Sequence, residues 1–263
     1  MDFEKICLAV CKIARETGKF IQEEKSKITA ELIEIKGSHD FVTYVDKTSE
    51  RKLVEELRIL VAGSGFLTEE KTVSEQTNEY TWIIDPLDGT TNYIHGLEPY
   101  AISIALVHKS ETVIGVVHVV TNNECFYAWK DSKAYLNGNE IRVSNRKGIA
   151  DSLIATGFPY YDYTRIQQFM QTLEYFFRHS HGVRRLGSAA TDLAYVACGR
   201  FEAFYEYSLN PWDVAAGALI VERAGGRVCD FKGGDDYVFG KEIIATNEMV
   251  FEEFLEKIKT VMN

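Results

Sequence analysis

The chain has 263 residues, and its 39 Asp and Glu outnumber its 29 Lys and Arg, which leaves a formal net charge of −10. With 46% hydrophobic residues, this is the composition of a globular protein with a substantial core. The acidic balance argues against a nucleic-acid polymer or an anionic membrane surface as the main partner, because both are bound largely through Lys and Arg. An acidic protein can still bind a phosphate when divalent cations lie between its carboxylates and the ligand.

The cysteines and the N-terminus indicate a reducing compartment. The five cysteines are an odd number without paired zinc-type spacing, and the first residues lack the basic and then apolar pattern of a signal peptide. We therefore expect reduced thiols in a cytoplasmic protein. Cys7 and Cys11 share the apolar face of a predicted helix, where core packing explains them. No apolar stretch approaches the ~20 residues of a membrane-spanning helix.

The N-terminal part of the chain predicts alternating helices and strands. Apolar residues recur at helical spacing over 2–25, so a long amphipathic helix opens the fold. A strand over 41–45 precedes a second helix at 53–61. The short apolar runs 65–67 and 81–84 predict buried strands that end in acidic residues, and the ends of strands are where functional sites collect.

The rest of the chain predicts a meander followed by mixed structure. Residues 101–143 have the pattern of antiparallel strands, with a tight turn at Asn137-Gly138. Beyond them, we expect strands at 153–156, 183–186, 201–205, 227–230 and 242–245, and helices at 164–178, 188–198, 212–224 and 247–262. The elements together predict an α+β protein with layered sheets and helices.

The most informative segment is 82–93, in which a strand leads into two carboxylates, Asp85 and Asp88, separated by a rigid Pro-containing turn. If a helix begins near Thr90, the backbone N–H groups of Gly89 and Thr90 form a seat for a phosphate. An isolated Asp-x-x-Asp-Gly is more often an ordinary turn. Here, further acidic residues stand at other predicted strand or loop ends: Asp46, Glu69, Glu70, Glu206 and Asp213. Converging carboxylates repel one another unless cations neutralise them, and hard oxygen ligands suit Mg²⁺.

Two segments match the long signatures of the inositol monophosphatase family. Residues 82–93 fit W-x-x-D-P-x-D-G-T-x-N-[FY], and residues 212–217 fit W-D-x-A-A-G. Phe41-Val42-Thr43 with Asp46, and the pair Glu69-Glu70, match in order and at family-like separations, so the resemblance covers nearly the whole chain. In one departure, Thr68 stands where the family usually has Gly before the Glu pair.

The resemblance implies a fold and an activity. The implied fold is a layered αβαβα sandwich of the inositol monophosphatase and fructose-1,6-bisphosphatase type, one unit over 1–263 with a metal- and phosphate-binding part at 1–145 and a substrate-side part at 146–263. The implied activity is that of a Mg²⁺-dependent, lithium-sensitive phosphatase. Relatives of this kind are typically homodimers, and we carry that expectation over.

The resemblance also implies residue roles. Two Mg²⁺ would share Asp85, and family members often hold a third, weaker one near Glu69. Thr90, paired with Asp46, would orient and deprotonate the attacking water, with Glu69 also near it. The implied metal ligands are Glu69, Asp85, the main-chain carbonyl of Leu87, Asp88 and Asp213. The implied substrate contacts are Gly89, Thr90, Gly187, Ser188, Ala189, Glu206 and Asp213, with Glu206 accepting hydroxyl hydrogen bonds, and Lys36 fits a family lysine near the metal rim.

Several alternatives stay open at this point. The simpler interpretations are that Ser188 is only a helix cap and that Glu206 is a solvated carboxylate. The expected substrate is myo-inositol monophosphate, with fructose 1,6-bisphosphate, the 2′-phosphate of NADP(H) and 3′-phosphoadenosine nucleotides as alternatives. The protein could also be a catalytically idle regulatory or interaction protein. Tyr160, Tyr161 and Tyr163 could stack on a nucleotide base, and His179 and His181 could ligate a metal, although a surface loop explains the histidines better.

Overall fold

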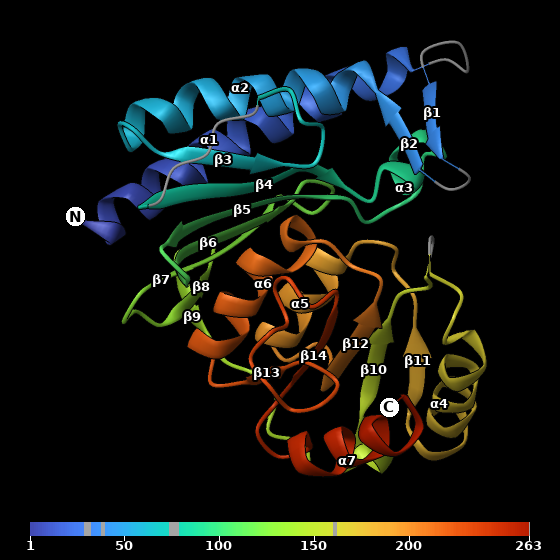
Figure 1. Cartoon of the computed structure of the whole chain (residues 1–263). Coiled ribbons are helices and arrows are strands. Elements are labelled where there is room, and N and C mark those ends of the chain that lie inside the picture. The colour runs from blue at the N-terminus through green and yellow to red at the C-terminus, as the bar shows by residue number, and fades with distance from the viewer. Residues whose placement is uncertain (29–32, 38–39, 74–78, 160–161, 263) are drawn as a thin grey trace.

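The computed structural model describes residues 1–28, 33–37, 40–73, 79–159 and 162–262, with backbone alone at 33, 35–37, 40 and 41. Helices and sheets stack in five layers, in the order α/β/α/β/α, with the N-terminal helices at one end of the stack and the C-terminal helix at the other (Figure 1). The predicted layered α+β architecture is confirmed.

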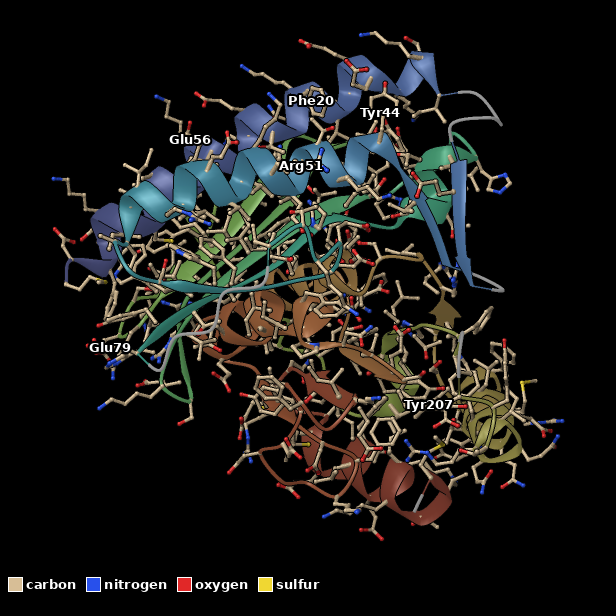
Figure 2. The ribbon with its side chains drawn as sticks, turned by 45° about the horizontal axis from the view of Figure 1, so that its top comes forward. Phe20, Tyr44, Arg51, Glu56, Glu79 and Tyr207 are labelled. Carbon is tan, nitrogen blue, oxygen red and sulfur yellow. The ribbon has the colours of Figure 1, made fainter. Side chains whose placement is uncertain are left out.

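The first layer is a pair of helices, α1 (Phe3–Glu24) and α2 (Tyr44–Leu60), which carry Phe20, Tyr44, Arg51 and Glu56 in Figure 2. The predicted helix over 2–25 is confirmed. The predicted strand over 41–45 is wrong at its end, because α2 already begins at Tyr44. Thr43 and Asp46 cap α2 reciprocally, which places Asp46 inside the first helical turn. Between the helices lie the 3-10 turn η1 (Lys25–Lys27) and the hairpin β1 (Ile33–Gly37) and β2 (Asp40–Thr43).

The second layer is a seven-stranded sheet in which only β3 and β4 are parallel. Its strands, in spatial order, are β3 (Gly65–Thr68), β4 (Tyr80–Asp88), β5 (Ala101–His108), β6 (Glu111–Val119), β7 (Glu124–Trp129), β8 (Ala134–Leu136) and β9 (Asn139–Ile141). Strand β5 is apolar along most of its length because helices cover both faces of the sheet. Alternate residues such as Ile102 and Ile104 enter the core under α1 and α2, whereas Ala101 and Ala105 enter the core on the other side.

The third layer consists of α5 (Ala189–Ala197) and α6 (Pro211–Arg223), which lie between the two sheets (Figure 1). Nearly all of α5 and the middle of α6, residues 214–221, are buried, which explains the small and apolar side chains there. A Cβ atom on Gly217 of α6 would lie 2.6 Å from the Cβ of Leu193 on α5. The absence of a side chain there lets the two helices pack closely.

The fourth layer is a five-stranded mixed sheet, and the fifth covers its outer face. The sheet contains, in spatial order, β11 (Gly182–Arg184), β10 (Leu153–Thr156), β12 (Ala203–Tyr207), β14 (Glu242–Thr246) and β13 (Arg227–Cys229). The outer helices α4 (Ile166–His179) and α7 (Phe251–Met262) pack on it, and the rings of Phe176 and Phe254 stack at 4.8 Å between centroids. The short helices α3 (Thr90–Ile94) and η3 (Ile149–Asp151) complete the fold.

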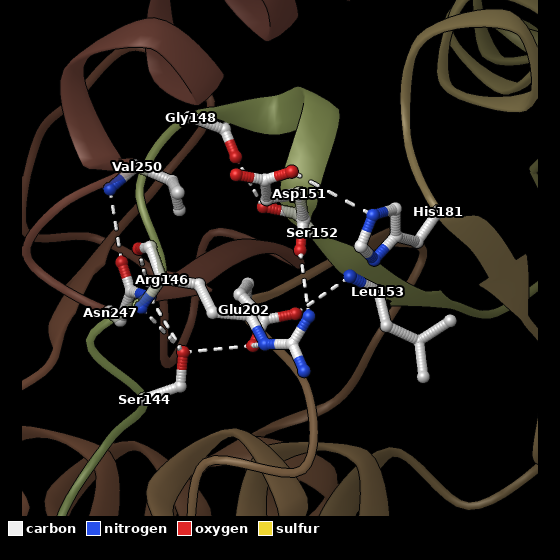
Figure 3. A network of polar contacts seen from close by, with 10 residues as sticks. All are labelled: Ser144, Arg146, Gly148, Asp151, Ser152, Leu153, His181, Glu202, Asn247 and Val250. Atoms are coloured by element: carbon white, nitrogen blue, oxygen red, sulfur yellow. Dashed lines mark hydrogen bonds and ion pairs between the residues drawn. The ribbon is translucent and has the colours of Figure 1, made fainter.

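A polar network joins the connection before β10 to β12 and α7 (Figure 3). The buried carboxylate of Glu202 accepts hydrogen bonds from Ser144 Oγ (2.8 Å) and the backbone N–H of Leu153 (2.7 Å). Asn247 donates to Ser144 Oγ and accepts from the N–H of Val250 at 3.0 Å. These contacts hold 247–250 outside the helix, so α7 begins four residues later than the predicted 247–262.

The cysteines are free, and Cys7 and Cys11 are buried in the core under α1, as predicted. Within the residues described above, no helix combines the length and apolarity needed to cross a membrane.

Candidate active site

A pocket lies where the end of β4 meets α3, α5, α6 and β12. It is lined by the predicted catalytic, metal-binding and substrate-binding residues apart from Asp46, whose carboxylate contacts Thr90: Glu69, Asp85, Leu87, Asp88, Gly89, Thr90, Gly187, Ser188, Ala189, Glu206 and Asp213. Residues from both sheet layers and from the helices between them therefore meet in one place. They come from two segments, 69–90 and 187–213, that are far apart in the chain.

The acidic turn 85–89 leaves the regular sheet at one end of β4. The pairing of β4 with β5 is interrupted between Asp85 and Asp88, and Asp85 Oδ1 accepts a hydrogen bond from the N–H of Leu87 (2.9 Å). Gly89 then adopts φ +95°, in the left-handed region, and a Cβ atom there would lie 3.1 Å from the carbonyl oxygen of Pro99. Glycine allows this close approach, after which α3 begins at Thr90.

Thr90 contacts the buried carboxylate of Asp46. Its Oγ1 lies 2.9 Å from Asp46 Oδ1 and 2.9 Å from the carbonyl oxygen of Leu87. The other oxygen of Asp46 accepts hydrogen bonds from Thr43 N (2.9 Å) and Thr43 Oγ1 (2.6 Å). The capping box of α2 therefore fixes the carboxylate that meets the Thr90 hydroxyl.

The opposite wall of the pocket is tied to the acidic turn through Asp88. Its Oδ2 accepts hydrogen bonds from Ser188 Oγ and the N–H of Ala190, both at 2.7 Å. Ser188 also caps α5, because its Oγ accepts from Thr191 N (3.2 Å). Ser188 is thus both a helix cap and a partner of Asp88. Asn92 adds a second tie, since its Nδ2 donates to the carbonyl oxygens of Pro99 and Leu186, both at 2.8 Å.

Burial raises the pKa values of the four acidic side chains around the turn, and repulsion between carboxylates adds to the shift at Glu69, Asp85 and Asp213. Burial, and then repulsion by Glu69, Asp88 and Asp213, raise the pKa of Asp85 well above its ordinary value. Burial likewise raises the pKa of Glu69, whose carboxyl group contacts that of Asp85. Burial raises the pKa of Asp88 to about 6, and burial together with repulsion by Asp88 raises the pKa of Asp213 to about 8. The pocket therefore favours protonated or cation-bound carboxyl groups over free carboxylates.

Glu206 lies within β12 and not at its end. It is 7% exposed, so the interpretation of Glu206 as a solvated surface carboxylate is wrong. A Cβ atom on Gly157 would lie 2.0 Å from the Glu206 carboxyl group, which therefore rests directly on the Gly157 backbone. Burial, with repulsion by Asp213 and Asp88, raises the pKa of Glu206 well above its ordinary value.

The structure adds site residues that the sequence analysis missed. Asp192 lines the pocket from α5, is 1% exposed, and its Oδ1 has no hydrogen-bond partner among the described residues. The sequence feature that could have indicated Asp192 is that it is the one acidic residue in a largely apolar predicted helix. Gly157 and Phe158 line the pocket just after β10, and Arg185 lies across the ring of Phe158 at 5.4 Å.

Other predicted candidates lie away from the pocket. His179 Nδ1 is 2.8 Å from the carbonyl oxygen of Tyr175, and His181 lies 3.7 Å from Asp151. Both histidines are exposed, which agrees with the surface loop that the sequence favoured for them. Tyr163 is exposed and does not line the pocket. Tyr160, Tyr161 and the side chain of Lys36 lie outside the described residues.

The chemistry of the donor set fits Mg²⁺. Glu69, Asp85, Asp88 and Asp213 offer only oxygen atoms, and a divalent cation would compensate the burial and mutual repulsion that raise their pKa values. Over the described ranges, no three acidic, His or Cys side chains already close around a common point as a finished metal centre. The carboxylates instead line the pocket walls.

Known proteins resemble the chain over nearly its whole length. The model of the inositol monophosphatase family matches residues 2–263. A Neisseria meningitidis protein named putative Nus factor SuhB is 41% identical over 94% of this chain and 95% of its own length. A Caulobacter vibrioides inositol-1-monophosphatase is 38% identical over 94% and 98%, respectively.

Solved structures agree with this match. An extragenic suppressor protein SuhB from Bartonella henselae superposes with a TM-score of 0.89 at 36% identity, covering 94% of this chain and 96% of that one. A Thermotoga maritima IMPase gives a TM-score of 0.86 at 35% identity, with 95% of each chain covered. This protein belongs to the inositol monophosphatase family.

Proposed function

We propose that this protein is a Mg²⁺-dependent phosphomonoester hydrolase whose substrate is myo-inositol monophosphate. The observation that carries the proposal is one pocket in which four acidic side chains, Glu69, Asp85, Asp88 and Asp213, stand beside the backbone N–H groups that begin α3. Carboxylates that repel one another are suited to binding cations, and the neighbouring N–H groups suit a phosphate.

The metal ligands follow the family resemblance. Glu69, Asp85 and the carbonyl of Leu87 would hold one Mg²⁺, and Asp85, Asp88 and Asp213 a second, with Glu69 near a weaker third. Bound there, Mg²⁺ would neutralise the phosphate and lower the pKa of a water molecule.

Thr90 and Asp46 would move the proton of the attacking water. The Thr90 hydroxyl lies 2.9 Å from Asp46 Oδ1, so it can pass its own proton to that oxygen as it takes one from water. Burial raises the pKa of Asp46, which makes this carboxylate a better proton acceptor. Attack on phosphorus breaks the phosphorus–oxygen bond to the alcohol, which leaves as inositol after taking a proton from solvent, and Asp46 later returns its own proton to solvent.

The far wall of the pocket favours an uncharged alcohol. Glu206 and Asp192 are both acidic, and Arg185, the cation near them, also faces Asp88. The carboxyl oxygens of such a wall can accept hydrogen bonds from the hydroxyl groups of the alcohol, whereas a single arginine already shared with Asp88 offers little compensation for a second phosphate. This supports inositol monophosphate over fructose 1,6-bisphosphate, NADP(H) and 3′-phosphoadenosine nucleotides.

The test is phosphate release from these four substrate classes at saturating Mg²⁺, with Asp88→Asn as the inactive control. We expect the fastest release from inositol 1-phosphate and none with the variant. Equal release by the Asp88→Asn protein would contradict the metal assignment. Preference for another substrate would change only the proposed alcohol part of the substrate and leave the proposed phosphatase activity in place. Inhibition by millimolar Li⁺ would support a metal site like that of other family members.

A second candidate function comes from the names of relatives. Proteins 41% and 39% identical to this chain are named Nus factors, so a role that needs no turnover is the competing proposal. The full set of pocket carboxylates favours catalysis, since a protein without turnover has no physical need to keep like charges together. Tight Mg²⁺ binding without phosphate release from any substrate would favour the second role. A cytoplasmic homodimer is part of our proposal, and sedimentation velocity tests its oligomeric state.

A further inference from the structure

Glu50 is a buried acidic residue that the proposed mechanism does not use. It lies on α2 one helical turn after Asp46, on the face that packs toward the pocket, and its side chain is fully buried. Its carboxylate accepts four hydrogen bonds. Oε1 accepts from Thr68 Oγ1 (2.9 Å), Thr72 N (2.7 Å) and Thr72 Oγ1 (2.7 Å), and Oε2 accepts from Glu70 N (2.7 Å).

These donors lie on both sides of Glu69. Thr68 ends β3 immediately before Glu69, and Glu70 follows directly after it. Glu69 itself donates its N–H to the carbonyl oxygen of Ile84 (3.2 Å), which continues the pairing of β3 with β4. Since the backbone of Glu69 is held by β4 and its neighbours by Glu50, the Glu69 side chain is left to meet Asp85 in the pocket.

We infer that Glu50 is a positioning residue for Glu69: it fixes the turn 68–72 so that the Glu69 carboxylate faces the metal-binding end of the pocket. The inference rests on the proposed function, in which Glu69 is a metal ligand. One surface of α2 then serves the site twice, through Asp46 beneath Thr90 and through Glu50 beneath Glu69.

The inference also gives a physical role to Thr68. This residue replaces the glycine that usually precedes the Glu pair in the family, and glycine has no hydroxyl group. The Thr68 hydroxyl supplies one of the four bonds to Glu50, so in this chain the departure strengthens the attachment of the turn to α2.

Glu50→Gln tests the inference with little change in shape. If the amide oxygen takes the place of Oε1, the amide nitrogen faces the N–H of Glu70, and two donors meet. If the amide is flipped, the three donors at Oε1 lose their acceptor. Glu56→Gln is the matched control, because it removes the same charge from an exposed position of the same helix (Figure 2). Glu69→Gln is the reference for loss of the ligand itself.

Three quantities would be measured for each variant: the Mg²⁺ concentration giving half-maximal phosphate release, the affinity for Mn²⁺ by calorimetry without substrate, and the melting temperature in EDTA. Loss of a partner that orients a metal ligand typically weakens metal affinity by 10–100-fold. We expect Glu50→Gln to raise both half-saturating concentrations about tenfold, with kcat at saturating Mg²⁺ restored to within about threefold. Glu56→Gln should change neither.

The possible failures are distinguishable. A Glu50→Gln protein that melts earlier in EDTA but binds Mn²⁺ like the wild type would show a structural role only and overturn the inference. If Glu69→Gln also binds Mn²⁺ normally, the proposed metal role of Glu69 is wrong as well. Should Glu50→Gln not fold, Thr72→Val removes a single bond to Glu50 and should still raise the half-saturating Mn²⁺ concentration measurably; unchanged affinity would overturn the inference.

Discussion

Two groups of buried carboxylates in this protein have opposite surroundings. Glu202, in the network of Figure 3, accepts hydrogen bonds from Ser144 and Leu153 and lies 3.7 Å from Arg146. Asp85 accepts one hydrogen bond from its own turn and otherwise faces Glu69, Asp88 and Asp213. Burying a carboxylate is costly unless donors or cations compensate it. Glu202 finds that compensation within the chain, whereas in the proposed function a bound cation supplies it to the pocket carboxylates.

The comparison predicts the largest effect at Asp88. Asp88→Asn removes a charge of the proposed metal site with almost no change in volume, so we expect kcat/KM to fall by at least about a thousandfold. The metal-free variant should be at least as stable as the wild type, because one repelling charge is gone. Phosphate-release kinetics and urea unfolding in EDTA measure the two effects. A large loss of stability would place Asp88 with Glu202 as a structural carboxylate.

The converse change is Glu202→Ala. It leaves the N–H of Leu153 and the Ser144 hydroxyl without their acceptor, and we expect the free energy of unfolding to fall by about 3 kcal/mol. Half-saturation by Mg²⁺ should not change. Urea unfolding followed by circular dichroism measures the loss. Glu248→Ala breaks the exposed pair with Arg227, so it is the control and should cost at most about 1 kcal/mol. An altered Mg²⁺ dependence of Glu202→Ala would show that the two groups are coupled.

The pH dependence of the metal-free protein separates the groups further. Asp88 and Asp213 have pKa values of about 6 and about 8 in the folded protein, above their ordinary value. The folded state therefore binds more protons than the unfolded chain from about pH 4 to pH 8, and stability falls as the pH rises through this window. We expect a decrease on the order of 2 kcal/mol in EDTA. Urea unfolding at pH 5 and pH 8 measures it, and saturating Mg²⁺ should abolish it. A stability that rises with pH in EDTA would contradict the raised pKa values of Asp88 and Asp213.

The smallest expected effect is at Gly157. A methyl group there would displace the Glu206 carboxylate, which rests on the Gly157 backbone. Gly157→Ala should raise KM for inositol 1-phosphate about fivefold, equivalent to about 1 kcal/mol, with little change in kcat. Hydrolysis of p-nitrophenyl phosphate is the control and should not change, because its alcohol part has no further hydroxyl group that could donate a hydrogen bond to Glu206. An equal effect on both substrates would mean that Glu206 does not contact the alcohol part of the substrate.

The sequence was sufficient where a structural feature depends on one continuous segment. The turn 85–89 was predictable, because a strand, two carboxylates and a glycine that can adopt a positive φ follow one another directly in the sequence. The start of α2 was misplaced by the β-propensity of 41–45, which the capping by Thr43 overrides.

Glu50 and Asp192 could not be assigned in the same way. Glu50 lies in a charged helical stretch and looks like a surface residue, because the donors that bury it come from 68–72. The burial of Asp192 depends on both sheets closing around α5, which is a property of the layered fold and not of any local pattern.

The proximity of Asp88 in the acidic turn to Asp213 of α6 also has a consequence for biosynthesis. Asp85 and Asp88 leave the ribosome long before Asp213, and the far wall of the pocket, with Glu206, is synthesised only shortly before it. The nascent chain therefore carries an exposed acidic turn that lacks its last partner until most of the protein has been made. If the proposed metal site is correct, its full set of ligands is complete only after most of the chain has been synthesised, so cation binding by the whole set is a late event in folding.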